Sequence, residues 1–199
     1  MNKAANMKAR ILETAISLFS HYSFGKTSVD DIAREARISK GTVYYYFRNK
    51  EELFLSAVNR KAEEFFNILD ERLQSCSGFE EKLTMYFRFP MSFIFTNMPI
   101  LLEGMAHIPM SYQERLHEDK RIYQSRMKSV LLSVLNIGRE EGLINKSVDF
   151  DRLVDLINDW FMLSDVNYSC IDKERVISRI ERDHEMIIQL ILYGIIKRS

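Results

Sequence analysis

The sequence is poor in residues that interrupt helices and in residues that crosslink small domains. Its 199 residues include only 7 Gly, 3 Pro and 2 Cys. A turn-rich sheet protein needs more glycine and proline, so the composition favours long helices. The two cysteines, Cys76 and Cys170, lie far apart and outside any CxxC or Cys/His spacing, which argues against a disulfide framework or a metal site. We expect an all-α protein with free, buried or half-buried thiols.

Sequence signals for membranes and for catalysis are also missing. No apolar run approaches the roughly 18 residues of a membrane span, and residues 1–15 lack the continuous apolar stretch of a signal peptide. There is no phosphate loop, no GxSxG and no HExxH motif, and the four histidines suggest no metal set. The sequence therefore predicts a cytoplasmic protein with no membrane partner, no catalytic residues, no metal and no cofactor.

Charge is balanced overall but unevenly distributed. The chain has 28 basic and 28 acidic residues. Residues 1–50 contain nine Lys and Arg against four Asp and Glu, a net charge of +5, and the remainder therefore carries −5. Such asymmetry indicates that the first fifty residues face a polyanion.

Apolar periodicity predicts three helices in this basic region. The first covers residues 7–22, and short helices follow at 29–36 and 40–47, with Ser28 and Ser39 in position to cap them. The apolar stripe of the first helix consists of Ile11, Ala15, Leu18, Phe19 and Tyr22.

The rest of the chain also has helical periodicity. Asn49 and Glu52 have capping-box spacing and open a helix to about residue 74. Ser111 and Glu114 form a second such pair, opening a helix that Gly142 ends. Further helices are predicted around 101–106, from Asp149 to about residue 170, and from Asp172 to about residue 197. We expect about nine helices, arranged as a three-helix domain at 1–50 and a helical domain at 51–199.

Two short helices joined by a tight turn in a basic region form a helix-turn-helix pattern. At about 100° per residue, Val43 and Phe47 of the second helix face inward. A tyrosine can bind phosphate through its hydroxyl and lie against sugar or a thymine methyl through its ring. The alternative is that the tyrosines merely cover a small domain. The outward and flanking residues are Lys40, Gly41, Thr42, Tyr44, Tyr45 and Tyr46.

The stretches 27–33 (TSVDDIA) and 38–53 (ISKGTVYYYFRNKEEL) resemble the DNA-binding signature of the TetR family over about residues 8–58. The resemblance implies a dimeric repressor that binds double-stranded operator DNA and responds to a small molecule. Arg37 departs from the family pattern, because glycine is common at this position in the turn. Tyr46 takes a position often held by His. The implied DNA contacts are Thr27, Ser28, Lys40, Gly41, Thr42, Tyr44, Tyr45, Tyr46 and Lys50.

The resemblance also implies that the later helices bind an effector and form a homodimer. The wide apolar faces in residues 149–197 fit pairing with a second copy; a buried hairpin in a monomer is the alternative. The effector itself is unknown, and aromatic and Met residues suit an apolar or amphipathic one. Each candidate, His107 included, has an ordinary structural role as its alternative, and a ligand-free architectural or division-control protein is the alternative for the whole chain. The candidates are Phe89, Phe93, Met105, His107, Tyr123, Met127, Trp160 and Tyr168.

Prolines are the last feature of this region. Pro90, Pro99 and Pro109 interrupt the aromatic segment 85–110. Because proline cannot continue a helix interior without losing a backbone hydrogen bond, we expect this segment to be kinked and loosely joined.

Overall fold

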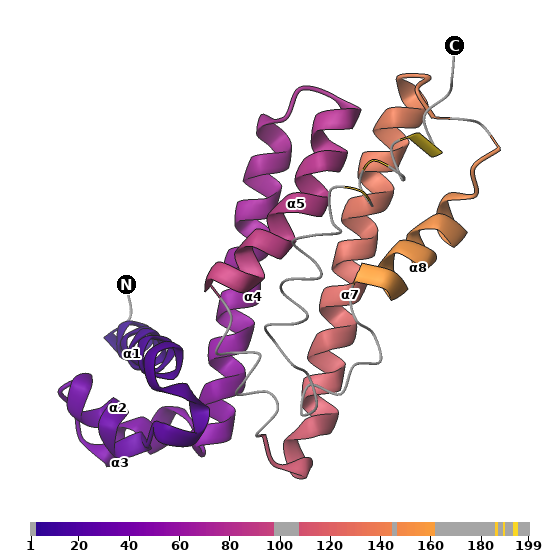
Figure 1. Cartoon of the computed structure of the whole chain (residues 1–199). Helices are drawn as coiled ribbons and strands as arrows, with labels where there is room; N and C mark the ends of the chain where they lie inside the picture. The colour runs from indigo at the N-terminus through magenta and orange to yellow at the C-terminus, as the bar shows by residue number, and fades with distance from the viewer. Residues whose placement is uncertain are drawn as a thin grey trace. The chain divides into compact units, whose positions relative to one another are not determined.

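The computed structural model of the chain describes residues 3–97, 108–144 and 147–161, together with residues 186, 189, 193 and 194. These residues form helices joined by turns, so the predicted all-α class is confirmed (Figure 1). The helices predicted around 101–106 and 172–197 fall largely or wholly outside the described residues, and the total of nine stays a prediction. The described helices are α1 Lys3–Lys26, α2 Val29–Glu35, α3 Lys40–Tyr46, α4 Lys50–Ser75, α5 Phe79–Asn97, α7 Met110–Glu140 and α8 Phe150–Phe161.

The chain divides into two compact units. The first comprises Met1–Glu64 and Thr96–Asp119, and the second comprises Phe65–Phe95 and Lys120–Ser199. Both α4 and α7 therefore contribute residues to each unit. The boundary predicted at residue 50 refers to function and not to contact units, so this division does not test it and it stays a prediction.

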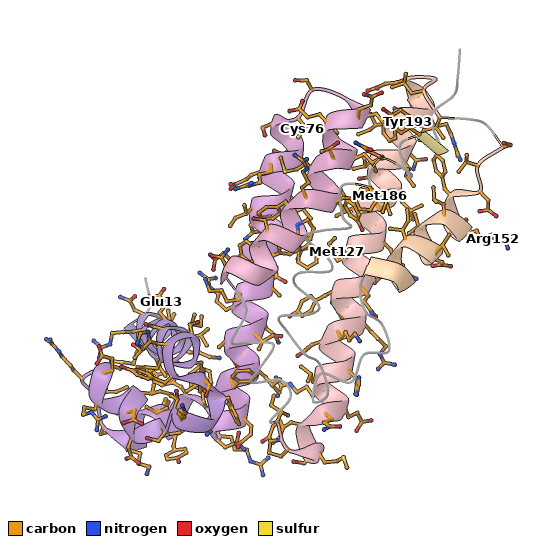
Figure 2. All side chains as sticks on the ribbon, viewed as in Figure 1. Glu13, Cys76, Met127, Arg152, Met186 and Tyr193 are labelled. Carbon is orange, nitrogen blue, oxygen red and sulfur yellow. The ribbon has the colours of Figure 1, made fainter. Side chains whose placement is uncertain are left out.

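The core of the first unit is aromatic and closely packed. Phe54 of α4 makes edge contacts with Phe19 and Phe24, with ring centroids 5.3 and 4.9 Å apart. On α1, Ile11 faces this core while Glu13 is exposed (Figure 2). The core also includes buried side chains of α2 and α3, so α4 and the helix-turn-helix share one hydrophobic cluster. Its other members include Ala15, Val29, Ile32, Ala33, Val43, Phe47, Leu53 and Ile108.

In the second unit, α7 approaches α5 at a glycine. A Cβ atom added to Gly138 would lie 2.6 Å from the Phe79 ring and 2.8 Å from Ile144, so only glycine fits there. Gly142 then ends the helix as predicted, with a φ of 72°. The Leu143 N–H bonds the Gly138 carbonyl at 2.9 Å, and the Gly142 N–H bonds that of Arg139 at 3.1 Å, as in a Schellman cap.

Cys76, at the junction of α4 and α5, is a buried free thiol, as predicted (Figure 2). Burial raises the pKa of this thiol. Cys170 lies outside the described residues. Asp149 caps α8 as predicted, because its carboxylate accepts from the Arg152 N–H at 3.1 Å. The helices that the structure describes include none that is long and apolar enough to cross a membrane.

The predicted place of Tyr22 on the core stripe is wrong. Its side chain is 53% exposed. The helical path breaks at Ser23, which has a φ of 72°. Phe24, beyond the break, packs against Phe19 with ring centroids 6.0 Å apart and closes the core at this end.

The segment expected to be kinked and loosely joined is described only at residues 85–97 and 108–110, so that expectation stays a prediction, whereas the cap expected at Ser111 is wrong. Helix α5 runs continuously through Pro90. The lost N–H removes one backbone bond, and buried Phe89 and Phe93 hold the helix on either side by packing. Helix α7 begins at Met110 rather than after a cap at Ser111. The Tyr112 N–H bonds the Pro109 carbonyl at 2.9 Å, so Pro109 and not Ser111 is the residue just before the first helical turn.

Candidate functional site

The turn that leads into α2 is fixed by Thr27. Its side chain is only 3% exposed, and its hydroxyl donates to the carbonyl oxygens of Ser23 at 2.8 Å and Leu18 at 3.3 Å. This hydroxyl satisfies backbone groups left open by the break at Ser23. The O–H donor of Thr27 is thus used inside the protein. The phosphate contact expected of Thr27 stays a prediction.

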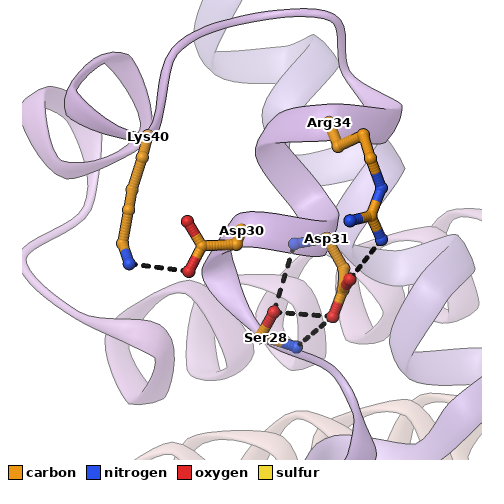
Figure 3. Close-up of polar contacts among 5 residues, drawn as sticks. All are labelled: Ser28, Asp30, Asp31, Arg34 and Lys40. Atoms are coloured by element: carbon orange, nitrogen blue, oxygen red, sulfur yellow. Dashed lines mark hydrogen bonds and ion pairs between the residues drawn. The ribbon is translucent and has the colours of Figure 1, made fainter.

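Ser28 caps α2 in a reciprocal capping box. Its hydroxyl accepts from the Asp31 N–H at 3.1 Å, and the Asp31 carboxylate accepts from the Ser28 N–H at 3.1 Å (Figure 3). The same carboxylate accepts from the Ser28 hydroxyl at 2.6 Å and pairs with Arg34. Hydrogen bonds from Ser28, chiefly from its side chain, lower the pKa of Asp31. The predicted cap at Ser28 is confirmed, and Asp31 is the partner that completes it.

The turn between α2 and α3 is left-handed at Arg37, the position that departs from the expected glycine. This residue adopts a φ of 52°, the left-handed conformation that favours glycine and costs other residues about 1–2 kcal/mol. The N–H groups of Arg37 and Ile38 bond the carbonyls of Arg34 at 3.1 Å and Ala33 at 3.0 Å. These bonds complete a Schellman cap and offset the strain.

Helix α3 presents tyrosines outward from a buried inner face. Val43 and Phe47 are 1% and 2% exposed, as the angular argument predicts. Tyr45 is 82% exposed and Tyr44 is 45% exposed. Tyr46 packs partly against the core, and its ring lies 5.0 Å from that of Tyr45 in an edge contact. Two of the three tyrosines are therefore available at the surface.

The start of α3 combines a cap with an open surface. Ser39 accepts from the Thr42 N–H at 3.1 Å, and the two hydroxyls are hydrogen-bonded at 2.8 Å. A Cβ atom added to exposed Gly41 would meet only the Ser39 hydroxyl, at 3.8 Å. Folding thus places no demand for glycine at residue 41, and a partner from outside has room to approach it.

Lys40, the first residue of α3, forms an ion pair with Asp30 of α2. Its Nζ lies 2.6 Å from Oδ2 of Asp30, and the side chains are 50% and 61% exposed (Figure 3). The bond to Asp30 raises the pKa of Lys40. Sequence reasoning placed Asp30 in the first turn of the second helix, where the helix dipole favours an acidic residue, but did not predict its contact with Lys40. The two residues are ten positions apart with a turn between them, so helical periodicity does not relate them.

Lys50 connects the start of α4 to the turn before α2. Its ammonium donates to the carbonyl oxygens of Phe24 at 3.0 Å and Thr27 at 3.2 Å, and it lies 4.2 Å from the centroid of the Phe24 ring. An ammonium has three donors, so two are used internally. The expected phosphate contact of Lys50 stays a prediction beside this structural role.

The capping box predicted at Asn49 is formed in part. The Asn49 side chain accepts from the Glu52 N–H at 2.8 Å, as predicted. The Glu52 carboxylate instead accepts from the N–H of Arg48 at 2.9 Å, one residue earlier than the predicted partner. The helix still begins at Lys50, as the sequence predicted.

A second cluster, in the second unit, gathers candidate ligand residues. Phe89 and Phe93 are buried against Phe65, with ring centroids 5.5 and 5.4 Å from it. Phe65 contacts Phe66 at 5.0 Å, and Phe66 lies 6.1 Å from Tyr123. We call these five rings the aromatic cluster.

Other groups complete the surroundings of the aromatic cluster. The guanidinium of Arg72 lies 4.5 Å from the Phe89 ring, and that of Arg126 lies 4.1 Å from the Phe66 ring. Met127 is buried one turn after Tyr123, and its carbonyl accepts from the buried Tyr86 hydroxyl at 3.4 Å. The two arginines, Phe65 and Phe66 were missed, because none has a motif. Met105, His107 and Tyr168, and the side chain of Trp160, lie outside the described residues.

Comparison with known proteins supports the resemblance of the helix-turn-helix. Residues 11–57 match the family model described as bacterial regulatory proteins, tetR family. Over these residues the chain has the DNA-binding domain of the TetR family. It is therefore a DNA-binding transcriptional regulator, and the resemblance in its helix-turn-helix is confirmed.

Known proteins are similar to this chain over most of its length. The fatty acid metabolism regulator protein of Bacillus subtilis (strain 168) is 23% identical over 177 residues, which is 81% of this chain and 87% of that protein. A transcriptional regulator from Saccharomonospora viridis, solved in complex with choline, has a TM-score of 0.73 at 17% identity and covers 98% of this chain and 100% of its own. FadR from Bacillus subtilis, solved in complex with stearoyl-CoA, has a TM-score of 0.62 at 19% identity and covers 94% and 98%. The two structures share the TetR-family fold with this chain.

Proposed function

We propose that this TetR-family regulator is a repressor that binds a palindromic operator as a homodimer and leaves it when a small apolar or amphipathic molecule binds. Residues 1–50 read the DNA, and residues 51–199 bind the effector and pair the two copies. As a regulator of bacterial genes, it works in the cytoplasm, where the chromosome lies.

The exposure of Tyr44 and Tyr45 carries the DNA-binding part of this proposal. Both rings project from a helix whose inner face is closed by Val43 and Phe47, so the core gives them no packing role. Their hydroxyls are suited to phosphate and their faces to sugar or a thymine methyl. Gly41 and Thr42 at the start of α3 line a major-groove contact, with Ser28 and Lys50 on flanking phosphates.

Homodimer formation is supported by α8. Val154 and Ile157 are buried, whereas Leu156 on the same helix is 66% exposed. Leu156 leaves a large apolar side chain exposed on α8 beside the buried side of the helix, and an isologous contact with a second copy covers it. The remaining predicted contacts, up to residue 197, lie mainly outside the described residues.

The effector site is proposed at the aromatic cluster. Its phenylalanines suit acyl chains or rings, while Arg72 and Arg126 lie against their faces and suit an anionic head group. A relative named for fatty acid metabolism and a neighbour solved with stearoyl-CoA support an amphipathic acid or acyl thioester. Another neighbour was solved in complex with choline, so quaternary ammonium compounds are a second class of effector to be tested.

Release follows from the continuity of α4. This helix holds Phe65 and Phe66 of the aromatic cluster and also Lys50, which is bonded to the turn before α2. An effector that packs against Phe65 favours a different position of α4 and thereby changes the distance between the two reading helices of the dimer. Operator half-sites have a fixed spacing, so DNA affinity falls; a coupling of about 1–3 kcal/mol is enough.

Selection of DNA from a random duplex pool tests the proposal. The wild-type protein should enrich a palindrome, and Tyr45→Ala, which alters an exposed side chain, should enrich none while unfolding at the same temperature. Each effector class is then added to the selected operator complex. Ligands that bind the protein but leave operator affinity unchanged would refute release, and a wild-type pool without a palindrome would refute operator reading.

A further inference from the structure

Two acidic residues lie in the first turn of α2, and each makes a different contact. Asp31 completes the cap with Ser28 and pairs with Arg34 on its own helix. Asp30 reaches across the turn to Lys40 of α3 instead, as Figure 3 shows. Asp31 provides the side-chain cap at the helix start, so the Asp30 carboxylate is available for the contact with Lys40 between the helices.

The Asp30–Lys40 pair lies at the surface. Both side chains are at least half exposed, at 61% and 50%, while their charged atoms are 2.6 Å apart. An exposed pair of this kind adds little to stability. Its location matters more, because Lys40 opens the helix that carries the exposed tyrosines.

We propose that Asp30 limits the DNA affinity of this protein, because its carboxylate binds the Lys40 ammonium that would otherwise bind a DNA phosphate. This inference rests on the proposed DNA-binding role of α3. A phosphate oxygen that approaches Lys40 meets an ammonium whose charge the Asp30 carboxylate already neutralises, and the carboxylate itself repels the phosphate backbone. The pair is electrically neutral, so it contributes no counterion release when DNA binds, whereas an unpaired Lys40 contributes about one ion.

The effect acts on DNA of any sequence. Binding to non-operator DNA consists almost wholly of phosphate contacts, so one withheld lysine weakens it directly. Operator binding is weakened by a similar factor, since the base contacts are left untouched. Asp30 thus restrains the protein's occupancy of bulk DNA without altering which bases are read.

Duplex binding of four variants tests this inference. Asp30→Asn keeps the shape and removes the charge. Glu35→Gln is the matched control, because Glu35 is an exposed acid at the other end of the same helix. Together with the wild type and Asp30→Asn, the variants Lys40→Gln and Asp30→Asn/Lys40→Gln complete a double-mutant cycle. Each protein is titrated with a random-sequence duplex and with the selected operator at several salt concentrations, after its thermal unfolding has been measured.

Asp30→Asn should bind both duplexes about two- to fivefold more tightly, a range set by the strength of exposed ion pairs. Its log–log salt slope should steepen by about 0.9. Glu35→Gln should keep the wild-type slope, and the double variant should match Lys40→Gln. Unchanged or weaker binding by Asp30→Asn, or a gain that persists without Lys40, would overturn the inference. A wild type that shows no preference for the selected operator contradicts the proposed function instead, because the random duplex still measures the effect of Asp30.

Discussion

The side-chain amide of Asn49 donates a hydrogen bond to the hydroxyl of Tyr112, 63 residues further along the chain. Asn49 also caps the start of α4 through the Glu52 N–H. Tyr112 lies in the first turn of α7 and packs against the core of the first unit together with Leu116. The beginning of α7 is therefore hydrogen-bonded to the beginning of α4, beside the helix-turn-helix.

Tyr112→Phe should destabilise the first unit by about 0.5–1.5 kcal/mol, because it removes this hydrogen bond and leaves the ring packing in place. Urea unfolding measures the loss, and amide exchange should accelerate at the first turn of α4. Tyr22→Phe is the control, because Tyr22 is 53% exposed and should change nothing. Equal stability of both variants would mean that the bond contributes nothing in solution.

Ser28→Ala should cost about 0.5–2 kcal/mol at neutral pH, as the loss of a helix cap does. Hydrogen bonds from Ser28 keep the pKa of Asp31 in the folded protein below its usual range, so ionised Asp31 stabilises the fold. That contribution is fully present above the unfolded pKa of about 4 and is lost as pH falls through the folded value.

The substitution should therefore raise the pKa of Asp31 and reduce the share of stability lost in acid. Carbon NMR of the Asp31 carboxyl follows the first effect, and unfolding at a series of acidic pH values follows the second. Ser17→Ala, at an exposed position of α1, serves as the control. An identical Asp31 titration in wild type and Ser28→Ala would contradict the capping account.

Leu156→Glu should convert the dimer into a folded monomer. Because Leu156 is 66% exposed in the single chain, the change should leave the helical content intact and act only on pairing. Ile122→Glu alters a residue of α7 that is 57% exposed and outside the predicted interface, so it should remain dimeric. Sedimentation at micromolar concentration compares the wild type with these two variants. A wild type that sediments as a monomer would contradict the proposed homodimer.

Lys50→Ala should have two separable effects. Loss of the bonds to the Phe24 and Thr27 carbonyls should lower the unfolding temperature. Loss of a phosphate contact should weaken DNA binding and flatten its salt slope by about one ion. Lys61→Ala, on the same helix, removes a lysine that pairs with Glu64 and controls for net charge. A lowered unfolding temperature with an unchanged slope would assign Lys50 to structure alone.

Local signals in the sequence predicted much of this molecule. Ser28, Ser39 and Asp149 cap their helices because a cap depends on residues only three positions apart. The inward positions of Val43 and Phe47 followed from helical periodicity alone. Helical periodicity and side-chain chemistry suggested that the tyrosines contact DNA, and the family resemblance added the positions at which such contacts are expected.

What the sequence did not predict has several physical causes. Tyr22 lost its predicted place because the chain breaks at Ser23, where no glycine or proline marks the break. Pro90 stayed within a helix because packing on both sides outweighed one missing hydrogen bond. The Asp30–Lys40 pair and the Asn49–Tyr112 bond depend on how helices meet, and sequence periodicity describes each helix separately.

The reading of DNA by α3 is tested most directly by guanine-methylation protection on the selected operator. The account predicts two patches of major-groove protection, about one helical turn or slightly more apart, related by the symmetry of the palindrome. Tyr45→Ala protein should lose both patches at concentrations where the wild type protects them fully. Protection spread evenly along the duplex, or an identical footprint from Tyr45→Ala, would contradict it.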